Sequence, residues 1–164
     1  MNKRIAVFLL HPYLISILNV LVLVLFYSSV KATWIYLRPE DHFEEAVELW
    51  DGFGTILLGF GVILEERGSI QKILGLKLGS AAHDAEKFVE SVCHNYGVLF
   101  VILGVIIELF AWLVKIPNEV LDTHGVEFTM VNIAALAAAL AAVLQLKFFW
   151  ELTTTHIRVR KMRA

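Results

Sequence analysis

The sequence predicts an all-α fold, specifically an integral membrane four-helix bundle with both termini in the cytoplasm. The apolar composition, four long apolar segments and the distribution of lysine and arginine together predict it. Hydrophobic residues make up 58% of the 164 residues, and charged residues make up only 18%, against about 25% in soluble domains. The mean hydropathy is +0.70. A soluble domain of this size leaves roughly a third of its chain surface in water, so it would expose many of these apolar side chains.

The same composition excludes several classes of protein. A chain this apolar is not intrinsically disordered. A formal net charge of -2 and a pI near 6.3 argue against nucleic-acid binding. The single cysteine, Cys93, excludes an internal disulfide and a metal site built from several cysteines. We therefore expect residues 1–164 to form a single transmembrane domain, in contact with membrane lipid and without nucleic acid as a partner.

A helix needs roughly 20 apolar residues to cross about 30 Å of hydrocarbon. The first predicted span, residues 5–30, has no formal charge. Pro12 is expected to kink it or to lie in its first turns. The run is longer than the apolar region of a signal peptide, so we interpret it as a retained anchor. The third and fourth predicted spans are residues 91–114, with Glu108 as the only formal charge, and residues 128–146, with none.

The second span is the weakest. Gly52–Leu64 has only 13 uncharged residues, which make about 20 Å of helix. To cross the bilayer, the helix must begin near residue 46 and include Glu48 and Asp51; otherwise it is a re-entrant segment. We expect a span over residues 46–64, with both acids just outside the hydrocarbon and Trp50 at headgroup depth. Residues 69–78 are expected to form a short amphipathic stretch on the inner membrane surface.

Lysine and arginine crowd one side of this predicted topology. Ten lie at the two chain ends or between the second and third spans, and three lie on the opposite side. Positive residues concentrate in cytoplasmic segments, so both termini are predicted to be cytoplasmic, which requires an even number of spans. A bacterial-type inner membrane is the expected location. The ten are Lys3, Arg4, Arg67, Lys72, Lys77, Lys87, Arg158, Arg160, Lys161 and Arg163, and the three are Lys31, Arg38 and Lys115.

Small residues recur at helical spacing in three of the spans. Because lipid tails are as apolar as leucine, close packing of small residues and interhelical hydrogen bonds hold membrane helices together. The expected contact faces are Gly52, Thr55 and Gly59 in the second span, Gly97 and Gly104 in the third, and Ala134, Ala138 and Ala142 with a second row of Ala135 and Ala139 in the fourth.

Polar residues follow one line of the third predicted helix. Glu90, His94 and Glu108 fall on the same side as Gly97 and Gly104. Intramembrane acids usually face protein or water rather than lipid. One interpretation is an ion or proton path through these three residues. The other is a buried polar interface in which Glu108 is neutral or hydrogen-bonded to a neighbouring span, because no titratable residue lies between Val98 and Glu108.

Histidines and carboxylates also gather at the predicted cytoplasmic helix ends. Two histidines with several carboxylates suit Fe, Mn or Zn, and His11 in the first span is close enough in depth to join them. The alternative is a solvated rim that balances nearby lysines and arginines. The candidate metal ligands are Glu65, Glu66, Glu90, His94, Glu151 and His156.

Three functional hypotheses follow. The first is a non-catalytic subunit or accessory factor of a larger membrane assembly, whose partners are other membrane subunits or further copies of the chain. The second is a small ion channel or proton-coupled carrier that uses Glu90, His94 and Glu108. The third is a metal-binding membrane oxidoreductase. The sequence contains no phosphate-binding glycine loop and no Gly-x-Ser-x-Gly nucleophile motif, so it favours a protein that is not an enzyme.

Overall fold

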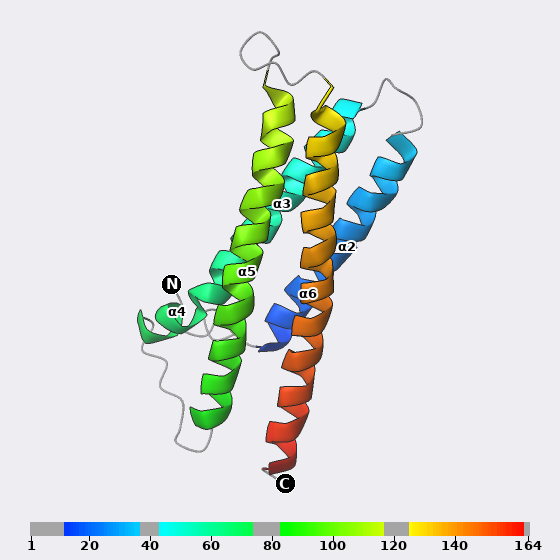
Figure 1. Ribbon diagram of the computed structural model, residues 1–164. Helices are drawn as coiled ribbons and strands as arrows, with labels where there is room; N and C mark the ends of the chain where they lie inside the picture. The colour runs from blue at the N-terminus through cyan, green and yellow to red at the C-terminus, as the bar shows by residue number, and fades with distance from the viewer. Residues whose placement is uncertain (1–11, 37–42, 74–82, 117–124, 163–164) are drawn as a thin grey trace.

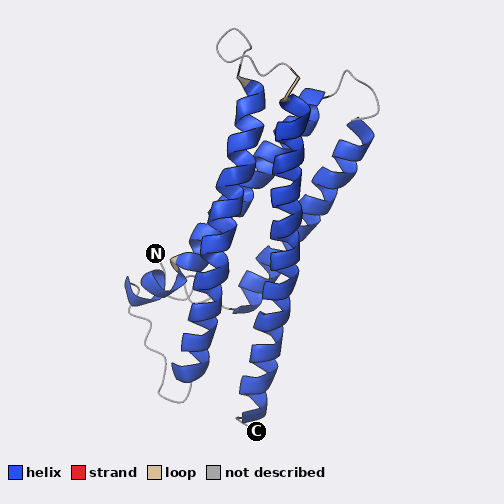
Figure 2. Ribbon diagram, viewed as in Figure 1, coloured by secondary structure: helices blue, strands red, loops and turns tan. Residues whose placement is uncertain are grey.

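The computed structural model describes residues 12–36, 43–73, 83–116 and 125–162. These residues form helices joined by short turns and no strand (Figures 1 and 2). The helices are α2 (Pro12–Tyr36), α3 (Phe43–Glu65), α4 (Arg67–Ile73), α5 (His83–Lys115) and α6 (Glu127–Met162).

The four long helices form an up-and-down bundle in which neighbours in the chain are neighbours in space. The interface between α3 and α5 is the most extensive, followed by that between α5 and α6, and α2 packs against both α3 and α6. The beginning of α2 and the end of α6 lie at the same end of the bundle, and α4 projects sideways there (Figure 1). All four are long and apolar enough to cross a membrane. The predicted all-α bundle with four spans is therefore confirmed.

The helix boundaries differ from the predicted spans. The weak second segment is a continuous helix of 23 residues, about 34 Å long, so it is long enough to cross as a full span. The third helix begins at His83 and the fourth continues to Met162, so both extend beyond their apolar parts. Residues 69–73 of the predicted amphipathic stretch belong to α4, which begins at Arg67 and ends at Ile73; residues 74–78 lie outside the described residues. Their location on the inner membrane surface stays a prediction.

Two pairs of glycines bring the backbones of α3 and α5 into contact. An ideal Cβ built on Gly61 would lie 2.7 Å from the carbonyl oxygen of Gly97, and one built on Gly97 would lie 2.8 Å from the carbonyl oxygen of Gly61. Gly54 and Gly104 approach each other in the same reciprocal way, at 3.1 and 2.9 Å. On both helices the glycines are seven residues apart, which is about two helical turns, so they lie on the same side of each helix. The glycine sides of the two antiparallel helices can therefore face each other along the interface. We call this contact the glycine seam.

The seam uses different α3 residues from those predicted. Gly97 and Gly104 on α5 were expected to permit close approach, and they do. Gly52 and Gly59, which were also expected to lie on a contact face, meet no other helix of this chain, because no described atom lies within 4 Å of a Cβ built on either one. A contact of this face with another chain stays a prediction. The seven-residue repeat that begins at Gly54 faces α5, since it continues the buried face that includes Phe53, Leu57 and Leu64.

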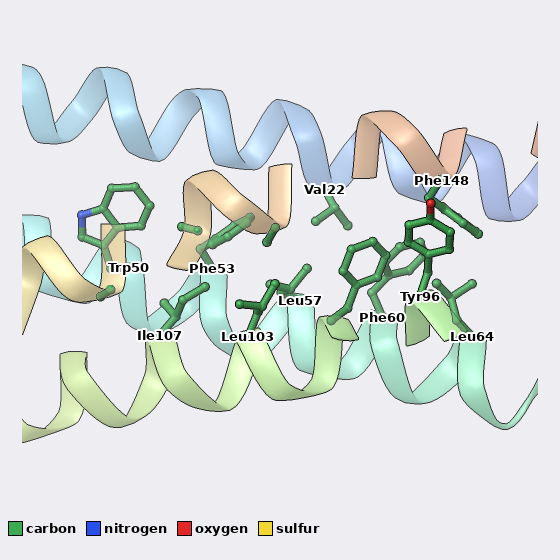
Figure 3. Close-up of a cluster of buried hydrophobic side chains, with 14 of the residues drawn as sticks. Val22, Trp50, Phe53, Leu57, Phe60, Leu64, Tyr96, Leu103, Ile107 and Phe148 are labelled. Carbon is green, nitrogen blue, oxygen red and sulfur yellow. The ribbon is translucent and has the colours of Figure 1, made fainter. Parts of the chain in front are cut away.

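Aromatic side chains fill both halves of the core (Figure 3). In one half, Phe60, Phe100, Phe148 and Tyr96 join α3, α5 and α6, with ring centroids of neighbouring pairs 5.3–6.5 Å apart. Such stacked, tilted and edge contacts are favourable for aromatic rings. These contacts fix the position of α6 against the α3–α5 pair.

Aromatic rings also join α2 to α3 in the other half. Trp50 contacts Phe26 and Phe53 at centroid distances of 6.3 and 6.4 Å. The side chain of Trp50 is only 3% exposed. Trp50 points into the bundle, because it shares the buried face of α3 with Phe53 and Leu57. Its predicted location at headgroup depth stays a prediction.

Alanines form the inner face of α6. Ala134, Ala138 and Ala142 are buried, as their spacing predicted, and Ala141 lies beside them. The second predicted row is divided: Ala135 is partly buried and packs against the core, whereas Ala139 is exposed. Small side chains on this face allow α6 to lie close to its neighbours.

The glycine seam predicts opposite effects for two glycine-to-alanine substitutions. Gly97→Ala places a methyl group 2.7 Å from the backbone nitrogen of Glu65, so we expect a loss of about 1–3 kcal/mol in the free energy of unfolding in detergent. The matched control is Gly59→Ala, which meets no neighbour and gains about 0.5–1 kcal/mol from helix propensity. Equal stability of the two variants would contradict the seam.

Candidate functional site

Glu108 lies at the outer edge of the glycine seam and contacts a neighbouring span. The hydroxyl of Thr55 on α3 donates a hydrogen bond to Oε1 of Glu108, with an oxygen–oxygen distance of 3.3 Å. Glu108 is partly buried and Thr55 is exposed. The backbone of Glu108 also packs against Gly54. This carboxyl group is therefore held between two helices, with one side open to the outer surface of the bundle.

Toward the beginning of α3 and the end of α5, an ion pair joins the same two helices. Nζ of Lys115 lies 2.6 Å from Oδ2 of Asp51. Both side chains are about one-third exposed, so the pair contributes little to stability. It places Asp51 and Lys115 at the same end of the bundle, as the predicted topology requires.

At the other end of the seam, Glu90 takes the place of a third glycine on α5. Gly68 follows Gly61 at the same seven-residue interval, and a Cβ built there would overlap the carboxylate of Glu90. Glu90 therefore lies directly against the backbone of α4. At this third position, the carboxyl group of Glu90 packs against the backbone of α4. At the first two positions, Gly61–Gly97 and Gly54–Gly104, the two backbones contact each other directly.

Glu90 and His94 line an open groove between α4 and α5. The groove has a volume of about 360 Å³. Its wall is polar, with carboxylates, lysines, hydroxyl groups and one histidine. These lining side chains are Glu65, Ser69, Lys72, Lys87, Glu90, Ser91 and His94.

Two glycine contacts lie between the residues of the predicted ion path, which stays a prediction. His94 and Glu90 lie in the groove, whereas Glu108 lies beyond both glycine pairs. Between them, the backbone of α5 is in van der Waals contact with α3 at Gly97 and Gly104. The side of α5 that carries Glu90, His94 and Glu108 is therefore also the side that packs against α3 through Gly97 and Gly104.

Three of the six candidate metal ligands come together in the groove. These are Glu65, Glu90 and His94. Glu66 is exposed, and Glu151 accepts a hydrogen bond of 3.1 Å from the hydroxyl of Tyr96. Within the described ranges, no group of three or more His, Cys, Asp or Glu side chains is arranged to hold a metal ion. The side chain of His156, and all of His11, lie outside those ranges.

Two buried amides were missed by the sequence reasoning. Asn19 on α2 and Gln145 on α6 are both fully buried. Nδ2 of Asn19 donates a 3.1 Å hydrogen bond to the backbone oxygen of Gln145. The signal was available, because an Asn and a Gln in otherwise apolar spans are candidates for interhelical hydrogen bonds.

A buried arginine was also missed. Arg67 begins α4 and is only 2% exposed, whereas the sequence analysis treated it only as one of the positive residues on the predicted cytoplasmic side. Its position beside Gly68 places it at the junction of α3, α4 and α5. No sequence pattern distinguished it from the surface lysines nearby.

Comparison with known proteins identifies no relative: no protein-family model, curated protein or solved structure matches this chain significantly. The fold and the positions of its polar groups therefore carry the functional argument. They define a multi-pass helical bundle with two polar features, the Thr55–Glu108 edge and the groove between α4 and α5.

The hydrogen bond between Thr55 and Glu108 predicts a small loss of stability when the Thr55 hydroxyl is removed. Thr55→Val keeps the shape of the side chain but removes the donor to Glu108, and we expect a loss of about 0.6 kcal/mol in unfolding free energy. Thr55→Ser retains the hydroxyl and is the control. A loss in Thr55→Ser as large as in Thr55→Val would show that the methyl group, not the hydrogen bond, matters.

The buried amide of Gln145 predicts a gain in stability on its replacement. Among the described residues, neither Nε2 nor Oε1 of Gln145 has a hydrogen-bond partner. Gln145→Met preserves the side-chain length and removes both polar atoms, so we expect a gain of about 1–3 kcal/mol. Asn132→Met, at an exposed position of the same helix, should change stability by less than about 0.5 kcal/mol. Destabilisation by Gln145→Met would reveal a partner for the amide.

Proposed function

We propose that this protein is a non-catalytic subunit or accessory factor of a larger membrane assembly. The observation that supports the proposal is the Thr55–Glu108 edge, a polar contact on the outer surface of the bundle at the middle of a span. Thr55 lies near the centre of the apolar Glu44–Glu65 segment. Lipid offers no hydrogen bonds at this depth, so a partly exposed hydroxyl–carboxyl pair there is better covered by another protein helix than by acyl chains.

Small residues on both sides of Thr55 support close approach by such a helix. Gly52 and Gly59 share its side of α3 and have no neighbour within 4 Å. Glycines spaced by about two turns allow a second backbone to approach closely. With Thr55 and Glu108, they form what we call the outer α3 face. The glycine seam on the opposite side of α3 already holds α5, so this face is available for a partner.

The proposal is tested by the size of the protein's complex in native membranes. Gly52→Leu combined with Gly59→Leu should convert a large complex on a native gel into the 18.5 kDa monomer, because the new side chains block close approach. Ala139→Leu changes an exposed small residue on α6 and is the matched control, which should leave the complex intact. Co-purification of two differently tagged copies distinguishes self-association from a different partner subunit.

Three outcomes contradict the proposal. The first is a wild-type protein that is monomeric in its own membrane. The second is a complex that survives the double glycine substitution. The third is ion or proton flux in liposomes that is abolished by Glu108→Gln, because a carrier needs the carboxyl group whereas a packing contact is preserved by the amide.

The cytoplasmic position of both termini and the bacterial-type inner membrane are part of the proposal and rest on the lysine and arginine distribution.

A further inference from the structure

The groove between α4 and α5 lies where the apolar segments of α3 and α5 end. Glu65 ends the apolar segment of α3, and Lys87 begins that of α5. Both side chains line the groove, so its position coincides with the ends of two spans. Ile73 at the end of α4 is 84% exposed, and Phe88, next to Lys87, is 51% exposed. Apolar side chains exposed beside a polar groove are typical of the boundary between headgroups and acyl chains.

The charges of the groove balance. Lys72 and Lys87 contribute two positive charges, and Glu65 and Glu90 contribute two negative ones. In the part of the chain that the structure describes, the recorded ion pairs involve none of these four side chains. A groove of this kind has no net preference for an anion or a cation. It is complementary to a ligand that carries both charges within a few ångströms.

We propose that this groove binds the phosphoethanolamine headgroup of a membrane phospholipid. The lysines, with the hydroxyl groups of Ser69 and Ser91, are suited to the phosphate. Glu65 and Glu90 are suited to the primary ammonium, which donates three hydrogen bonds in the manner of a lysine side chain. The tight packing of Glu90 on Gly68 holds one acceptor in place before the ligand arrives, which reduces the cost of ordering it.

The same chemistry distinguishes ethanolamine from choline. A quaternary ammonium donates no N–H hydrogen bond and is recognised by aromatic rings. The described residues that line the groove include no Phe, Tyr or Trp. The groove therefore favours the primary ammonium. A purely anionic lipid such as phosphatidylglycerol satisfies the lysines but leaves the two carboxylates without a partner.

Lipid retention on the intact protein tests this inference. The full chain is reconstituted in phosphatidylcholine nanodiscs that contain a minor share of phosphatidylethanolamine or phosphatidylglycerol, and the lipids released with it are measured by native mass spectrometry. Wild-type protein should retain phosphatidylethanolamine preferentially. Glu90→Gln, which keeps the side-chain shape, should reduce that retention about tenfold, as expected for loss of a charge-assisted hydrogen bond. Lys72→Ala with Lys87→Ala should reduce retention of both minor lipids.

Control variants and competitors make the test decisive. Glu48→Gln removes an exposed charge at the far end of α3, and Lys147→Ala removes one from α6 outside the groove; neither should change retention. Equal retention of ethanolamine and choline lipids, preference for phosphatidylglycerol, or insensitivity to Glu90→Gln would overturn the inference. Displacement of the lipid by free phosphoethanolamine would assign the groove to a soluble ligand and overturn its lipid assignment. The outer α3 face lies on different residues, so this result is independent of the proposed assembly.

Discussion

The close contact of α3 and α5 constrains the rest of the structure. Two reciprocal glycine pairs bring the backbones so close that a single methyl group at Gly61 or Gly97 would overlap the opposite helix. In a membrane, burial of apolar side chains between helices gains little over lipid contact, so such close packing is a main source of association. The seam also fixes the register of the two helices. Asp51 meets Lys115 at one end, and Glu90 meets Gly68 at the other, because both contacts continue the alignment that the glycines set.

The other two helices are attached by different means. α6 presents alanines and Phe148 to the core, while α2 contacts α3 through Phe26 and α6 through Asn19. Aromatic rings thus fill the wider spaces that the seam leaves on its inner side. The bundle combines one pair of helices in backbone contact with two helices packed through larger side chains, so local opening is more favourable at α2 than at the seam.

The polar groups follow the same division. Those on the inner side include the fully buried amides Asn19 and Gln145, whereas Glu90 and Glu108 lie at the two ends of the seam. Because the glycines leave no space between the two helices, a side chain as long as Glu90 or Glu108 must turn outward at the seam's edges. One of these edges lies at the middle of a span and the other at its end. That difference in depth underlies the two separate roles proposed for them, protein contact for the first and headgroup contact for the second.

The sequence by itself determined the number and approximate position of the spans, because each is a local property of some 20 consecutive apolar residues. It also identified Gly97, Gly104 and the Ala134 row as contact residues, since small residues at helical spacing are visible along one chain. Only the tertiary structure decided which side of α3 meets α5. Gly52 with Gly59 and Gly54 with Gly61 have the same spacing, and the choice between them depends on the aromatic face that α3 shares with α2 and α6. The burial of Arg67, Trp50 and Asn19 was decided in the same way, since burial is a property of neighbouring helices and not of the segment that carries the residue.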